Sequence, residues 1–112
     1  MSNIDENTFA SIQELMGANF SVMIEKYKES TSGYLADIEA GMASGDAEKV
    51  QNAAHPFKSS SASLGFLALS EVAKKIEHTA SEEGDVSDLQ NDCTELKAAY
   101  ADVMAFLDGR DL

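Results

Sequence analysis

The chain has 112 residues, of which 44% are hydrophobic, with one proline, one cysteine and a net charge of −12 at pH 7. This length and composition predict a single, largely helical globular domain over residues 1–112, and the lone Cys93 excludes an internal disulfide. The negative charge disfavours nucleic acids and anionic membranes as partners, because both present negative phosphates. We expect a cytoplasmic protein, since no apolar run approaches the ~20 residues that span a bilayer and the polar N-terminus lacks a signal-peptide pattern.

Apolar residues recur at helical spacing in five segments of the chain. The segments cover about residues 8–16, 19–43, 47–64, 67–82 and 87–107. Gly17 ends the first, and Gly33 is the point at which the long second segment would bend. Asp46 is the expected N-cap of the third segment and Gly65 its stop, while Gly84 interrupts the chain before the last.

Long helices joined by short loops pack side by side in opposite directions. The pattern therefore predicts an all-α fold, an antiparallel up-down four-helix bundle with a short additional N-terminal helix. No competing strand pattern is present in the sequence.

The segment from residue 54 to residue 65 contains the strongest functional signal. On a helix, His55, Lys58, Ser59 and Ala62 share one face, while Val50, Phe57 and Leu64 lie on the opposite face. This places an imidazole in solvent, next to a cation and beside side chains too small to shield it. Such an arrangement suits a nucleophile offered to a large partner that carries an anionic group.

Pro56 directly follows this histidine, inside the predicted helix. It cannot donate to the carbonyl of Asn52, a loss that costs about 3 kcal/mol in an ordinary helix interior. We therefore expect a bend beside His55.

The same segment resembles the signature of histidine-containing phosphotransfer (HPt) domains of bacterial two-component phosphorelays. That signature is a histidine, any residue, an apolar residue, lysine, glycine or serine, a run of small residues and Leu-Gly. The matching residues are His55, Phe57, Lys58, Ser59, Ser60, Ser61, Leu64 and Gly65. The resemblance extends to Glu14-Leu15-Met16-Gly17, Phe20, the turn at Gly45-Asp46 and Ala53-Ala54, and so covers nearly the whole chain.

The resemblance implies roles for three side chains. His55 would be the phosphoacceptor, Lys58 would help to neutralise the incoming phosphoryl group, and Glu77 would hydrogen-bond the imidazole. A carboxylate on one ring nitrogen fixes the tautomer and leaves the lone pair of the other nitrogen free to attack phosphorus.

The remaining candidates give weaker signals. His78 lies about 100° around the helix from Glu77, so we interpret it as a solvated residue. Cys93 has acidic neighbours in sequence, Asp92 and Glu95, and is expected to be inert packing. The sequence contains neither a His-x-x-x-His metal-binding pair nor a nucleotide-binding glycine loop, which argues against a metal site and against an ATP-dependent kinase.

The leading hypothesis is a phosphorelay carrier that accepts a phosphoryl group on His55 from a phospho-aspartate receiver domain and passes it to another receiver. It would be a phosphocarrier and not a turnover enzyme, without a cofactor of its own, because the catalytic Mg²⁺ would belong to the receiver. Receivers, and also a hybrid sensor kinase, would dock on a monomer around Ser59, Ala62 and Met16. Two alternatives stay open: a non-catalytic helical adaptor that docks receiver or kinase domains, and a phosphohistidine phosphatase.

Overall fold

The computed structural model describes residues 4–82 and 89–110. Within these ranges it contains five α-helices and one short 3₁₀ helix, and the prediction of an all-α fold is confirmed. The elements are α1 (Glu6–Met16), η1 (Gly17–Asn19), α2 (Phe20–Ser44), α3 (Ala47–Ser63), α4 (Leu67–Glu82) and α5 (Gln90–Asp108). None of the helices in the described ranges is both long and apolar enough to cross a membrane.

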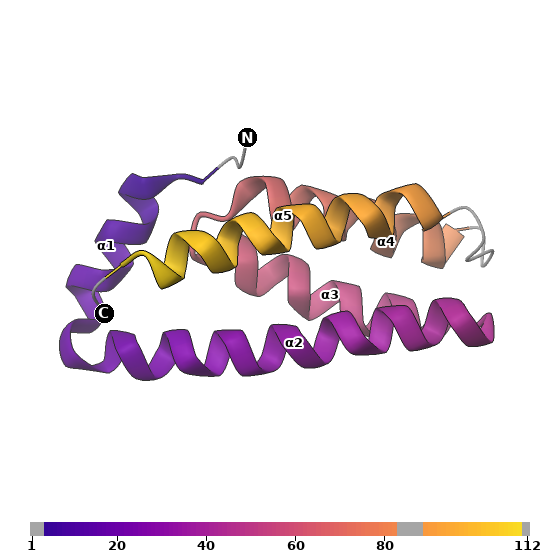
Figure 1. The fold of residues 1–112 in the computed structure, drawn as a ribbon, viewed down its shortest axis with the longest axis horizontal. Helices are drawn as coiled ribbons and strands as arrows, with labels where there is room; N and C mark the ends of the chain where they lie inside the picture. The colour runs from indigo at the N-terminus through magenta and orange to yellow at the C-terminus, as the bar shows by residue number, and fades with distance from the viewer. Residues whose placement is uncertain (1–3, 83–88, 111–112) are drawn as a thin grey trace.

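Helices α2 to α5 lie along the long axis of the molecule, and each runs in the direction opposite to the one before it (Figure 1). Helix α3 packs between α2 and α4, and α5 packs against α4. The shorter α1 lies across one end of the bundle (Figure 1). This arrangement gives α3 one face toward the core and one toward solvent.

Aromatic side chains fix α1 to the end of the bundle. The ring of Phe9 lies 5.2 Å from that of Phe20 and 5.0 Å from that of Phe106, both in edge-to-face geometry. Phe66 completes the cluster, with its ring 5.8 Å from that of Phe9. Arg110 covers the outside of the cluster, because its guanidinium lies 4.2 Å from the centroid of Phe106.

The N-terminal segment, Ile4 and Asp5, binds the turn between α3 and α4 at Gly65 and Phe66, and we call this contact the clasp. Gly65 has a φ of +86°, a conformation open to glycine, and it ends α3 as predicted. The Asp5 amide donates to the Gly65 carbonyl at 2.7 Å, and Ile4 forms an isolated bridge with Phe66. A Cβ on Gly65 would lie 2.6 Å from the Asp5 carbonyl oxygen, so the close approach also requires glycine.

The observed helix ends differ slightly from the predicted ones. Helix α1 begins at residue 6 instead of 8, because the Asp5 side chain caps it by accepting from the Thr8 amide. Helix α2 begins at Phe20 because residues 17–19 form a separate 3₁₀ turn, and it continues without interruption through Gly33. The predicted break at Gly84 and the predicted start of the last helix at residue 87 lie outside the described residues.

Two polar pairs, one buried and one partly buried, lie between the helices. The hydroxyl of Tyr27 on α2 bonds the hydroxyl of Ser61 on α3 at 2.8 Å, and burial strongly raises the pKa of this tyrosine. The hydroxyl of Thr31 bonds that of Tyr100 on α5 at 2.9 Å. One member of the serine run, Ser61, therefore has a structural role, because it is buried and its hydroxyl pairs with that of Tyr27.

Candidate functional site

Helix α3 presents His55 because its opposite face is locked into the core. Asp46 caps the helix by accepting from the Lys49 amide at 3.1 Å. Val50 and Phe57 are completely buried, as the spacing predicts. The His55 side chain is consequently 63% exposed.

The surface around His55 is built from small side chains. Ser59 and Ala62, one and two turns further along α3, are both exposed. The Ser59 hydroxyl turns back to the carbonyl of His55 at 3.2 Å, so it does not extend over the imidazole. A partner can therefore approach the ring closely.

Pro56 is accommodated within α3 without ending the helix. Its carbonyl accepts from the hydroxyl of Ser60 at 2.8 Å, one turn further on. The serine run therefore supplies local hydrogen bonds along the stretch that carries the proline.

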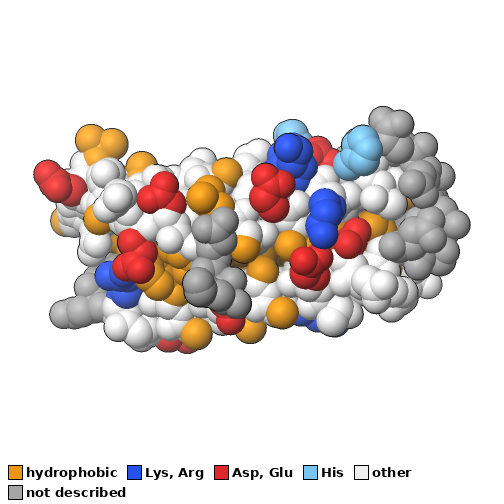
Figure 2. All heavy atoms as spheres, turned by 90° about the horizontal axis from the view of Figure 1, so that it is seen from above, with side chains coloured by type: hydrophobic (Ala, Val, Ile, Leu, Met, Phe, Trp, Pro, Cys, Tyr) orange, Lys and Arg blue, Asp and Glu red, His pale blue; other side chains and the backbone are white. Residues whose placement is uncertain are grey.

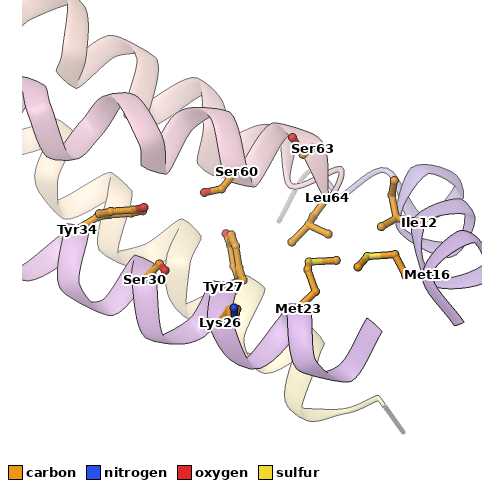
Figure 3. A pocket seen from close by; sticks show the side chains of 10 residues that line it. All are labelled: Ile12, Met16, Met23, Lys26, Tyr27, Ser30, Tyr34, Ser60, Ser63 and Leu64. Atoms are coloured by element: carbon orange, nitrogen blue, oxygen red, sulfur yellow. The ribbon is translucent and has the colours of Figure 1, made fainter. Parts of the chain in front are cut away.

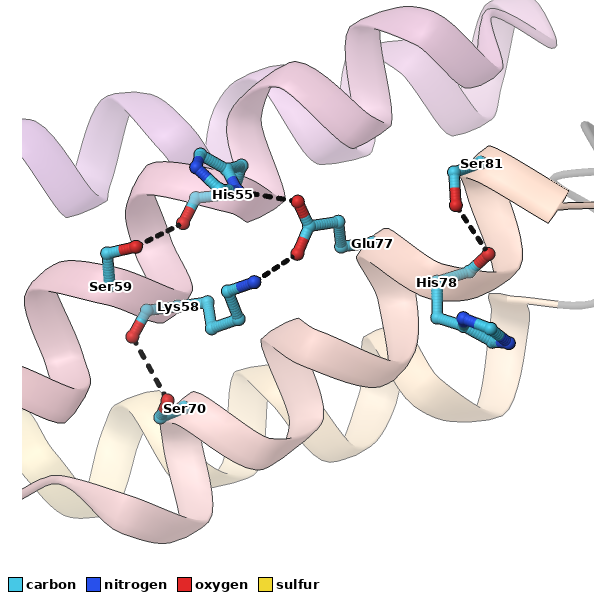
Figure 4. Close-up of polar contacts among 7 residues, drawn as sticks. All are labelled: His55, Lys58, Ser59, Ser70, Glu77, His78 and Ser81. Atoms are coloured by element: carbon cyan, nitrogen blue, oxygen red, sulfur yellow. Dashed lines mark hydrogen bonds and ion pairs between the residues drawn. The ribbon is translucent and has the colours of Figure 1, made fainter.

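Glu77 of α4 lies between His55 and Lys58 and contacts both (Figure 4). Its Oε2 is 2.6 Å from His55 Nδ1, and its Oε1 accepts from Lys58 Nζ at 2.5 Å. The Glu77 side chain is 19% exposed and that of Lys58 28% exposed, so these two groups form the less accessible layer beneath the imidazole.

The packing of α4 determines where Glu77 lies. Ala73, Ile76 and Ala80 are buried on the inner face of the helix. Near the start of α4, the Ser70 hydroxyl donates to the Lys58 carbonyl at 3.0 Å and ties the helix to α3. Because Ile76 points into the core, its neighbour Glu77 lies at the exposed edge between α3 and α4.

The contacts of Glu77 set its ionisation. Partial burial raises its pKa, but hydrogen bonds from Lys58 and His55 outweigh that effect, and the net pKa lies below the usual value. The ionised Glu77 carboxylate next to Nδ1 can only accept a hydrogen bond, so Nδ1 is the donor. The neutral ring then carries its proton on Nδ1, and Nε2 presents a free lone pair.

The structure brings together His55, Lys58 and Glu77, which sequence reasoning singled out. The position of Lys58 differs from the helical-face argument, which places it with His55 in solvent. Its long side chain instead bends toward α4 and is half-buried. The sequence of α3 alone could not indicate this, because the carboxylate that draws Lys58 inward comes from another helix.

Met16, the third candidate docking residue, lies in a groove along the flank of α3 that faces α1 and α2. The groove has a volume of about 400 Å³ and is bounded by α1, α2 and the end of α3 (Figure 3). Ile12, Met16, Met23 and Leu64 meet at one end of it, and Tyr34 marks the other end (Figure 3). Sequence reasoning named only Met16, because the other apolar residues of the groove read as core.

A family model for the Hpt domain matches residues 22–106. The chain belongs to the Hpt domain family. Among solved structures, its fold is similar to histidine-containing phosphotransfer protein B (HptB) from Pseudomonas aeruginosa PAO1, with a TM-score of 0.84 and 25% identity over 95% of this chain and 91% of that one. None of the curated proteins compared with the chain matches it.

Membership of the Hpt family establishes the general function of the chain. It takes part in histidine phosphotransfer in two-component signalling, and its partners are receiver domains of phosphorelays. The role of each side chain in this Hpt domain is argued below from the geometry.

The other candidate residues of this Hpt domain lie apart from the site. His78 is exposed, and Figure 4 shows its ring pointing away from Glu77. Cys93 is buried among core residues, and its pKa is raised by that burial and also by Glu39, whereas Lys97 lowers it. Within residues 4–82 and 89–110, no three His, Cys, Asp or Glu side chains come together as ligands for a metal ion.

Proposed function

We propose that His55 accepts a phosphoryl group on Nε2 from a phospho-aspartate receiver domain and passes it to a second receiver. The observation that carries the proposal is the contact of 2.6 Å between His55 Nδ1 and Glu77 Oε2, made by an imidazole whose side chain is 63% exposed. One nitrogen is thus fixed by the protein, and the other is left for a partner.

The step balances without a proton transfer. The Nε2 lone pair attacks the phosphorus of the aspartyl phosphate, a P–N bond forms, the P–O bond to the aspartate breaks, and the aspartate leaves as a carboxylate. The ring becomes a positively charged phosphoimidazolium that keeps its proton on Nδ1. The Glu77 carboxylate next to that proton stabilises the charge as it develops. The reverse step returns the phosphoryl group to another aspartate.

Lys58 supplies a fixed positive charge beside the reacting ring. Its Nζ is held by Glu77, the same carboxylate that holds His55. An ammonium that is already positioned and partly desolvated interacts more strongly with an incoming phosphoryl group than one free in water. We assign it the role of lowering the electrostatic cost of bringing that group to His55.

The receiver would dock over the exposed face of α3, on Ser59 and Ala62, and extend into the groove that contains Met16. The apolar lining of that groove and its place next to the His55 face support this choice. Mg²⁺ and the reacting aspartate would belong to the receiver, with no cofactor on this chain. We further propose that the protein acts as a cytoplasmic monomer and that a hybrid sensor kinase supplies one of the receivers.

The test is transfer of labelled phosphoryl from a phosphorylated receiver of the source organism. The wild-type chain should gain an acid-labile, base-stable label, and His55→Gln should gain none. His78→Gln is the matched control, since the chain has only two histidines, and it should keep the label. Label that persists in His55→Gln would overturn the assignment. Intact signalling by that variant would support the adaptor alternative.

A further inference from the structure

A second cavity borders the site on the side opposite the groove. It lies between α3 and α4 and has a volume of about 480 Å³. Lys58 and Glu77 form part of its wall, so this cavity and the His55 imidazole contact the same carboxylate. Its lining also includes the charged residues Glu71, Lys74 and Lys75.

The lining of this cavity differs in charge from the molecule as a whole. The chain carries a net charge of −12 with only eight lysines and arginines, and three of those eight line this cavity. Basic side chains gather on this part of the surface, with carboxylates between them (Figure 2). Two of the three lysines are committed to partners: Lys58 binds Glu77, and Lys75 binds Glu95 at 2.9 Å.

Lys74 makes no ion pair with any described residue and is exposed. It precedes Glu77 by three residues on α4, which places both side chains on neighbouring positions of one helical surface. Both side chains also line the same cavity.

An aspartyl phosphate is anionic, and a molecule with this net charge repels it at long range. A cation that lines the same cavity as Glu77, the residue that contacts the reacting histidine, lowers that repulsion where the phosphoryl group has to pass. We propose that Lys74, beside Lys58, forms an electropositive docking edge that faces the phosphorylated, anionic edge of the receiver. This inference rests on the proposed function, since it names a contact of the same site.

The experiment measures transfer over a series of receiver concentrations, which separates the second-order rate constant from the rate at saturation. Lys74→Glu should lower the second-order constant about threefold to tenfold at low salt and leave the saturating rate within about twofold. The loss should shrink as salt is added, because screening removes interactions between exposed charges. Lys74→Met, which removes the charge at similar length, should show a smaller loss in the same constant.

Lys49→Glu is the matched control. It changes the net charge by the same amount, lies on α3 in a different cavity with Tyr34 and Asp37, and has no ion pair among the described residues. It should keep the second-order constant within about twofold of wild type. Equal losses in Lys74→Glu and Lys49→Glu, or a loss confined to the saturating rate, would overturn the docking edge. Failure of the wild-type chain to accept any phosphoryl group would instead overturn the proposed function.

Discussion

Glu77 holds two groups at once, with one oxygen on His55 and the other on Lys58. The tautomer of the imidazole and the position of the ammonium therefore depend on the same carboxylate. Both contacts also lie behind the exposed ring, where they do not obstruct a partner. A single substitution at this residue should consequently affect the chemistry more than the docking.

Glu77→Gln tests that dependence. The amide keeps the size of the side chain but loses the charge that stabilises the phosphoimidazolium. Hydrogen bonds to charged groups contribute about 1.5–3 kcal/mol, so the saturating transfer rate should fall about 10-fold to 100-fold. Glu29→Gln, which changes an exposed glutamate on α2 away from the site, serves as the control and should keep the wild-type saturating rate. An unchanged rate in Glu77→Gln would show that the carboxylate does not act on His55.

The same carboxylate should make the fold sensitive to acid. Its folded-state pKa lies below the usual 4.5, so ionised Glu77 stabilises the fold at pH values above 4.5. That contribution is lost as the pH falls through the folded-state value. The free energy of unfolding, measured with urea, should therefore be about 1 kcal/mol larger for wild type than for Glu77→Gln near neutral pH. This difference should disappear in acid. A gap that stays constant on acidification would contradict the sign of the shift.

Sequence reasoning identified these residues for different reasons. His55 could be found from helical spacing alone, because the buried residues of α3 define the exposed face. Glu77 came from resemblance to a family, since nothing in the pattern of α4 distinguishes it from other polar residues. Sequence reasoning did not single out Lys74. Its relation to the site depends on how α3 and α4 pack, which a single sequence does not contain.

Helices α3 and α4 form the hairpin that carries the site, and its turn has a strict geometric requirement. Gly65→Ala would strain a backbone at φ +86° and place a Cβ 2.6 Å from the Asp5 carbonyl oxygen. We expect a loss of about 1–3 kcal/mol in the free energy of unfolding, measured with urea.

Gly33→Ala is the comparison within the same molecule. Gly33 lies inside α2, and a Cβ there would meet nothing within 4 Å. Alanine at that position should stabilise the fold by about 0.5–1 kcal/mol, because it favours the helix. Equal stability of Gly65→Ala and wild type would show that the clasp tolerates a side chain.

At the level of elements, periodicity was sufficient to predict the helices but not the start of every one. The segment now seen as α4 was predicted with both ends correct, since apolar spacing and Gly65 define it. The start of α1 was missed because the Asp5 cap precedes the apolar pattern. The 3₁₀ turn at residues 17–19 was also missed, since the apolar pattern gave no sign of it.

Across the whole molecule, α3 separates two surfaces of different character. The groove toward α1 and α2 is mainly apolar, whereas the cavity toward α4 is lined by charged side chains. A receiver centred on His55 would meet both. The apolar side suits affinity, and the charged side suits the rate and orientation of encounter. The two surfaces could not be predicted from composition, because the net charge of −12 is a sum over the whole chain and does not show where the charges lie.

The clasp between Asp5 and Gly65 also determines where other protein modules can be attached. The turn lies ten residues beyond His55 on α3, about 15 Å away along the helix axis. A domain or dye fused ahead of Ile4 would therefore emerge at the closed end of the hairpin, away from the imidazole. Fusions at this end should leave the imidazole uncovered, and a dye placed there would report opening of the hairpin and, because Leu64 beside the turn lines the groove, the arrival of a receiver in it.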